Sequence, residues 1–180
     1  MIAIFSRKKI CEDKLANILV NSLLKLSDEG FSEIAATINE DPSFISPPNV
    51  SSTLDREFLL IVVTGNLKQL QKRLANGQDQ RVRSLVISKL ADVFNIPDLQ
   101  LESQISELSG FMKRVNHPSK NTLYAMNKAL FYKYDLNGYQ DDYFKNMNSP
   151  NPLFLSRIND LMQFFLWDWD KFFADHKVTH

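Results

Sequence analysis

Polar and ionisable residues that could do chemistry gather between Asn116 and Tyr124. His117, the first of three histidines in the chain, could act as a general base or carry a proton. Lys120 lies next to an expected helix start, where free backbone amides and the helix dipole attract anions. The competing interpretation is helix punctuation, in which Pro118 ends one helix and Ser119 caps the next. The residues of the predicted ligand site are Asn116, His117, Lys120, Asn121 and Tyr124.

A second set of candidates is a basic stretch from Asn66 to Lys89, which holds six cationic side chains against the single acid Asp79. Such a stretch could contact phosphates, an anionic membrane surface or an acidic partner. A solvated outer face of two helices is the alternative, and no aromatic residues interleave the cations to stack on bases. The expected anion or acidic-partner contacts are Lys68, Lys72, Arg73, Arg81 and Arg83.

Catalytic and metal motifs do not emerge from the residue pattern. No group supplies a nucleophile, a base and an orienting partner together, which favours a non-catalytic protein over an enzyme. The single cysteine, Cys11, excludes an internal disulfide and a multi-cysteine zinc site. The run Asp135–Asp142 has its glycine at the fourth position, whereas a calcium loop of the EF-hand type needs it at the sixth. We therefore expect no metal and no cofactor.

The segment Lys89–Pro97 resembles the first helix and turn of helix-turn-helix DNA-binding proteins, with apolar, small and turn residues in the matching places. The next helix, which would enter the major groove, begins at Asp98, carries Glu102 and has no basic residue before Lys113. Groove-reading helices depend on arginine and lysine for most of their affinity. The sequence therefore predicts that nucleic acid is not the partner.

Apolar residues recur at helical spacing along most of the chain. We therefore expect helices to position the candidate residues. The Phe58–Val63 run and residues 1–5 could each also form a short buried strand, but the Phe58 stripe continues at helical spacing to Leu74. We predict an all-α, single-domain bundle of about seven helices over residues 1–180, with a proline-containing loop at 40–52. Helical patterns lie near residues 15–26, 31–38, 53–76, 79–96, 97–116, 119–134, 139–147 and 152–175.

The last of these helices, residues 152–175, has the widest apolar arc and is expected to be central. Phe164 and Trp167 fall outside that arc, three residues apart, near Arg157 and Lys171. An exposed aromatic pair surrounded by charge is typical of an interface anchor. These four residues are the predicted partner-binding set, unless another helix or the N-terminal segment covers the pair.

Length and composition fit a soluble globular domain, since 44% of the 180 residues are hydrophobic and 21 basic side chains balance 21 acidic ones. The longest apolar run is too short to span a membrane, and Met1–Ile10 lacks the pattern of a secretory signal, which predicts a cytoplasmic protein. The charges cancel only in sum, because residues 135–175 hold seven acids against three bases. This acidic segment and the basic stretch are expected to attract each other.

Two functions compete, and the first is favoured because no group of residues supplies a nucleophile, a base and an orienting partner together. The first is a non-catalytic interaction module, an adaptor or oligomeric scaffold that binds a protein partner or itself through the Phe164 and Trp167 face. The second is a helical small-ligand-binding protein or enzyme with a pocket near His117–Tyr124. A pocket that contains His117 and convergent polar groups would favour the second function, and a flat exposed aromatic patch would favour the first.

Overall fold

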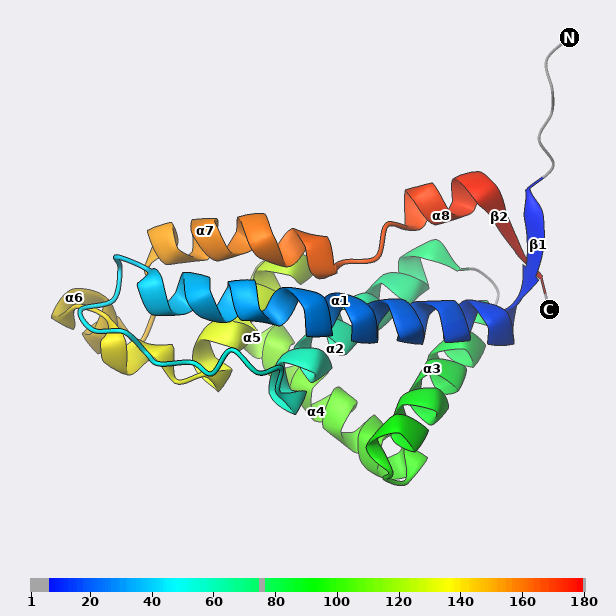
Figure 1. Cartoon of the computed structure of the whole chain (residues 1–180), viewed down its shortest axis with the longest axis horizontal. Coiled ribbons are helices and arrows are strands. Elements are labelled where there is room, and N and C mark those ends of the chain that lie inside the picture. Colours follow the sequence, from blue (N-terminus) through cyan, green and yellow to red (C-terminus); the bar gives the residue numbers. More distant parts are fainter. Residues whose placement is uncertain (1–6, 75–76, 180) are drawn as a thin grey trace, which may run out of the picture.

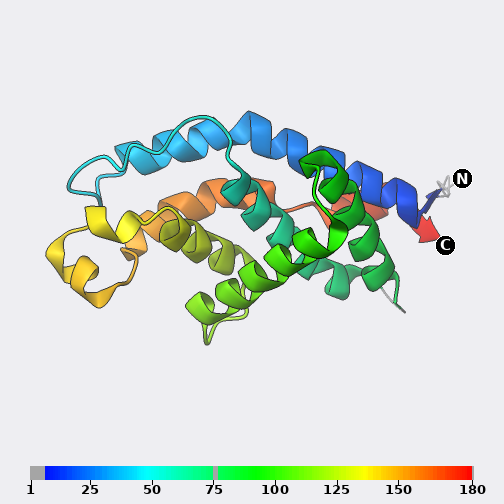
Figure 2. The same ribbon diagram turned by 90° about the horizontal axis from the view of Figure 1, so that it is seen from below.

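The computed structural model describes residues 7–74 and 77–179, and these are mostly helical, as predicted, in a single compact domain. The longest helix, α1, runs along most of the molecule (Figure 1), and the junction of α4 and α5 lies on the side away from it (Figure 2). No described helix is both long and apolar enough to cross a membrane. The helices are α1 (Glu12–Glu40), α2 (Arg56–Arg73), α3 (Gln78–Phe94), α4 (Asp98–Asn116), α5 (Thr122–Lys133), α6 (Asp142–Met147), α7 (Pro152–Met162) and α8 (Trp169–Asp175), with 3-10 turns η1 (Leu136–Tyr139) and η2 (Gln163–Phe165).

Helix α2 occupies the centre of the domain. Every residue from Phe58 to Leu67 is buried, and α1, α3, α4 and α5 all pack against this helix. The side chain of Asp55 caps it by accepting a hydrogen bond from the Phe58 amide at 2.9 Å. A Cβ at Gly65 would collide with Met126 on α5, so glycine permits this close approach. The apolar run at Phe58 is therefore a helix, which settles the alternative between strand and helix.

Two helices expected near residues 15–26 and 31–38 are in fact the single helix α1. Ser27, which lies between the two expected helices, is buried inside α1 with no exposed surface. The apolar stripe passes through this position without changing face, and a Cβ at Gly30 would meet the ring of Phe165. Gly30 thus provides a close contact for the C-terminal segment, and the helix continues through it.

The prediction of a long, central C-terminal helix is wrong. Helix α7 ends at Met162, the 3-10 turn η2 follows, and α8 begins only at Trp169. The side chain of Asn66 on α2 stabilises this interruption between α7 and α8. Its Nδ2 donates to the carbonyl oxygen of Phe165 at 2.8 Å, and its Oδ1 accepts from the amide of Trp167 at 2.7 Å. A contact from a distant helix therefore fixes the break, and α2 takes the central place.

A small parallel sheet was not predicted. Strand β1 (Lys8–Cys11) pairs with β2 (His176–Thr179), which brings the two ends of the described chain together. The segment that the sequence analysis offered as a strand, residues 1–5, lies outside the described residues. The predicted attraction between the basic and acidic segments is seen within the chain, where Arg73 and Asp170 form an ion pair at 2.7 Å.

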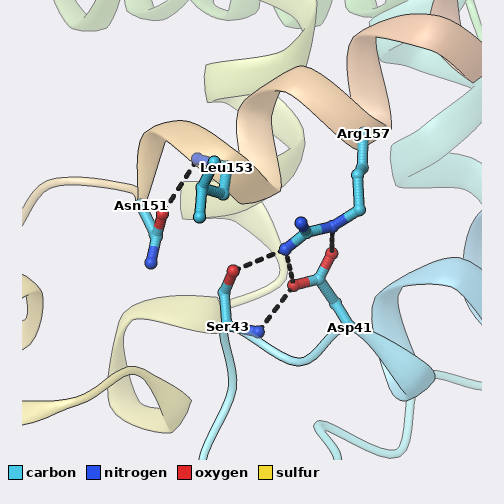
Figure 3. A network of polar contacts seen from close by, with 5 residues as sticks. All are labelled: Asp41, Ser43, Asn151, Leu153 and Arg157. Carbon is cyan, nitrogen blue, oxygen red and sulfur yellow. Dashed lines mark hydrogen bonds and ion pairs between the residues drawn. The ribbon is translucent and has the colours of Figure 1, made fainter.

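A partly buried ion pair, with Asp41 buried and Arg157 half-buried, ties the end of α1 to α7 (Figure 3). Arg157 donates Nε–H and Nη2–H to the two carboxylate oxygens of Asp41, both at 2.7 Å, and the Ser43 amide donates to the same carboxylate at 2.8 Å. Burial alone would raise the pKa of Asp41, but the hydrogen bonds from Arg157 and Ser43 outweigh burial and hold the pKa below its ordinary value. Asn151 caps α7 beside this contact by accepting from the Leu153 amide.

Replacing Arg157 tests how much its ion pair with Asp41 contributes to stability. Arg157→Met keeps most of the aliphatic stem but leaves the Asp41 carboxylate buried without its guanidinium, which should lower the free energy of unfolding by roughly 2–3 kcal/mol. Because folding lowers the pKa of Asp41, its contribution is present above the unfolded pKa and is lost as pH falls through the folded pKa. The difference from wild type should therefore be at its full size at about pH 7 and smaller at about pH 3 in urea unfolding.

The matched control is Arg73→Met, which breaks an ion pair whose aspartate is largely exposed. It should cost less than about 1 kcal/mol. An Arg157→Met difference no larger than the control, or one that does not change with pH, would contradict the proposed role of the Asp41 pair.

Candidate functional site

A lysine-lined hollow, here called the lysine pocket, lies where α2, α4 and α5 meet. It encloses about 420 Å³, which is within the range of small-molecule sites. Two cations come from the C-terminal half of α2, Lys68 and Lys72, one from the end of α4, Lys113, and one from the loop before α5, Lys120. No acidic side chain is among the described residues that line it. The pocket therefore concentrates uncompensated positive charge.

The crowding of these ammonium groups affects the pKa of Lys68. Partial burial lowers the pKa of Lys68, and the nearby charges of Lys72 and Lys113 lower it further. Each of these causes acts against the charged form of the side chain. An anion placed among the three lysines would offset the repulsion between their positive charges. The charges at this site therefore favour a negative ligand.

Asn116, at the end of α4, holds the loop that closes the pocket. Its Nδ2 donates to the carbonyl oxygens of Ser119 and Asn121, at 3.3 and 2.9 Å. Only 2% of the residue is exposed, yet its Oδ1 has no hydrogen-bond partner among the described residues. His117 and Ser119, both exposed, also line the pocket. The pocket lining thus offers several hydrogen-bond donors, whereas the Asn116 oxygen is covered by protein.

Asn121 and Tyr124, the other two residues of the predicted ligand site, do not line the pocket and have structural roles. Asn121 caps α5, because its side chain accepts from the amide of Tyr124 at 2.9 Å. This cap, rather than the expected one at Ser119, starts the helix, and it occupies one of the backbone amides that the sequence analysis offered to an anion. Tyr124 lies beyond the cap, where Lys128 packs over its ring. The structure thus brings Asn116, His117 and Lys120 to the pocket and leaves Asn121 at its edge as a cap.

The basic stretch divides into two parts. Lys68 and Lys72 line the pocket. The three arginines of the predicted contact set each meet a carboxylate of this chain, as does Lys89. These ion pairs are Arg73 with Asp170 at 2.7 Å, Arg81 with Glu12 at 2.8 Å, Arg83 with Glu102 at 2.5 Å and Lys89 with Asp13 at 2.6 Å. Pairing within the chain thus accounts for the arginines, and the two lysines are the part available to an anion.

The predicted partner-binding residues are spread over different environments. Phe164 is 68% exposed, while Trp167 is half-buried with its ring near Phe172, at a centroid distance of 6.1 Å. Arg157 is engaged with Asp41, and Lys171 is exposed on α8. Phe164 lies between two hollows of about 200 and 360 Å³ that also share Leu26 of α1. We call these two hollows together the Phe164 groove.

Sequence reasoning missed two parts of this surface. Lys113 completes the lysine pocket but carries no local motif, and only the packing of α4 on α2 shows its role. A larger hollow of about 620 Å³ lies between α2, α4 and α5, lined by Leu60, Phe111 and side chains of both charges. There Glu57 pairs with Lys133 at 3.2 Å. Its residues come from three separate helices, so no sequence window could have shown it.

No family model, curated protein or solved structure matches this chain. Among the described residues there is also no cluster of three or more side chains that could hold a metal ion. The lysine pocket and the Phe164 groove are therefore the features whose chemistry bears on function.

Proposed function

We propose that this protein binds a small anionic ligand, of the phosphate or phosphate-ester class, in the lysine pocket. The observation that carries the proposal is the convergence of four lysines on one concave site, with no acid among the described residues that line it. This is the second of the two functions expected from the sequence. The pocket contains His117 and convergent polar groups, which was the feature that would favour it.

Phosphate fits the pocket better than a carboxylate does, because one phosphate group can accept hydrogen bonds from several ammonium groups at once. Lysine binds phosphate as a mobile point charge rather than by a fixed two-point geometry. Lys68, Lys72 and Lys113 each lose some repulsion when a dianion enters. Most of the pocket lysines are exposed, so affinity should fall as ionic strength rises.

The half-buried lysine gives the sharpest test. Lys68→Met should weaken pyrophosphate binding by roughly tenfold or more, because a charge-assisted hydrogen bond is lost. The same change should raise the thermal midpoint of the ligand-free protein, since folding lowers the pKa of Lys68 and its charged form therefore disfavours the folded state at neutral pH. Isothermal titration calorimetry at low salt and thermal unfolding measure the two effects.

The control for charge is Lys14→Met, because Lys14 is exposed on α1 and takes no part in the pocket. That variant should bind pyrophosphate as the wild type does. Wild-type protein that binds no pyrophosphate at low salt, or a Lys68→Met variant that binds it as tightly as the Lys14→Met variant, would refute the proposal.

A second candidate function is the interaction module, and the Phe164 groove supports it. Apolar side chains from α1, α7 and η2 line it, and among its charged residues Glu29, Glu33, Asp168 and Asp175 outnumber Lys171. An amphipathic segment with apolar residues on one face and basic residues at its edges fits this combination. We propose such a segment of a protein partner as the occupant.

A synthetic amphipathic helix of leucine and lysine serves as the probe, and Trp167 in the groove is a natural fluorescent reporter. Phe164→Ser should weaken binding of this peptide by roughly tenfold, because exposed aromatic anchors carry much of an interface energy. The matched control is Leu153→Ser on α7, which is 64% exposed but outside the groove. Equal affinity of the two variants would exclude the Phe164 groove as the binding surface.

A further inference from the structure

We infer that Lys68 captures aldehydes that carry a phosphate group, by forming a covalent imine (a Schiff base) with the aldehyde carbon inside the lysine pocket. Lys68 supplies the amine, and the three exposed lysines of the pocket hold the phosphate. This inference rests on the proposed function, because it names a chemical class of ligand for the same pocket and adds a reaction to the binding.

Lys68 differs from the other lysines of the pocket in its position. It is half-buried on α2, whereas Lys72, Lys113 and Lys120 are exposed. Its charge interacts with those of Lys72 and Lys113, which line the same pocket, so its amine lies on the pocket side of the helix. Part of the Lys68 side chain remains accessible. A ligand that enters the pocket can therefore reach the amine.

A lysine acts as a nucleophile through its uncharged amine, because the ammonium form has no free electron pair. Burial and other positive charges nearby both favour the uncharged form. Lys68 meets both conditions, since burial is the larger cause that lowers its pKa and the charges of Lys72 and Lys113 lower it further. A larger share of Lys68 than of an ordinary lysine is therefore uncharged at neutral pH.

The groups that share the pocket with Lys68 maintain this state. The titratable groups among them are Lys72 on the same helix, Lys113 on α4, and His117 and Lys120 in the loop before α5. Because no acid occurs in the described lining, no carboxylate there stabilises the ammonium form of Lys68. A bound phosphate brings negative charge, but it leaves Lys68 buried, and burial is the larger cause of the lowered pKa.

The atoms of this reaction balance without an oxidant or a reductant. The nitrogen of Lys68 attacks the carbonyl carbon, and a C–N bond forms while an electron pair of the carbonyl moves to its oxygen. That oxygen leaves as water with the two hydrogens of the amine, and a C=N bond remains. Water reverses the reaction, so the ligand is held covalently but reversibly. The phosphate on the exposed lysines keeps the carbonyl close to the amine, which favours the attack.

Pyridoxal 5′-phosphate is a suitable probe, because it carries an aldehyde and a phosphate on one ring. Sodium borohydride reduces its imine to a stable amine, and peptide mass mapping then identifies the labelled lysine. Wild-type protein should take up about one label per chain, on Lys68, and excess pyrophosphate should prevent the labelling. Labels spread over the exposed lysines, or a label on another pocket lysine in preference to Lys68, would overturn the inference.

Three variants test the part played by Lys68 and its neighbours. Lys68→Met should lose the label, while Lys14→Met, which removes an exposed charge outside the pocket, should keep it. Lys72→Met should shift the pH of half-maximal labelling upward, because it removes one of the charges that lower the pKa of Lys68. Weaker phosphate binding alone reduces the extent of labelling without moving that pH. An unchanged midpoint in Lys72→Met would contradict the role of the neighbouring charges.

The inference and the proposed function fail in different ways. If calorimetry shows that the wild-type protein binds pyrophosphate but Lys68 takes up no label, the inferred reaction is wrong and the anion pocket stands. If the protein neither binds pyrophosphate nor takes up the label on Lys68, both proposals are wrong.

Discussion

The burial of α2 on all sides is the constraint on which the rest of this structure depends. A helix with ten consecutive buried residues, Phe58–Leu67, must be surrounded, and α1, α3, α4 and α5 supply its neighbours. Asn66, a buried amide on this helix, also needs hydrogen-bond partners. Asn66 meets this demand by bonding the backbone at Phe165 and Trp167, which sets the break before α8. The central helix thus determines both the packing order and the path of the C-terminal segment.

The lysine pocket is a consequence of how α2 leaves the core. Its next turns carry Lys68 and Lys72 while α4 and α5 still flank the helix, so these ammonium groups lie partly covered and close to Lys113. Such an arrangement is unfavourable for an empty protein. Proteins accept local instability of this kind at functional sites, where the ligand supplies the missing interaction.

Periodicity was sufficient to predict helices, and it was insufficient where a distant contact decides the outcome. The helix at Phe58 and the helix start after Pro97 follow from spacing and local signals. The division of α1 was wrong because Ser27 and Gly30, which lie between the two expected helices, are packed inside one helix, Gly30 against Phe165. The prediction of a continuous C-terminal helix was wrong because the apolar arc of residues 152–175 carries no information on the hydrogen bonds that Asn66 makes to Phe165 and Trp167. The β1–β2 pair joins residues about as far apart as the described chain allows.

The site was predictable to the extent that its chemistry is local. Asn116, His117 and Lys120 lie within one short segment and were found together. Lys113 was not found, since only tertiary packing brings it to Lys68. The three arginines of the basic stretch could not be excluded from sequence, because their carboxylate partners are distant: Glu12, Glu102 and Asp170 lie in other helices.

The most direct test of the anion pocket is a titration of isotopically labelled protein with pyrophosphate, followed by the backbone amide resonances at low salt. The account predicts saturable shifts at the C-terminal end of α2, the end of α4 and residues 117–122, with α1 and α7 unchanged. Shifts spread over all exposed lysines, or the absence of any saturable shift around Lys68 and Asn116, would contradict it.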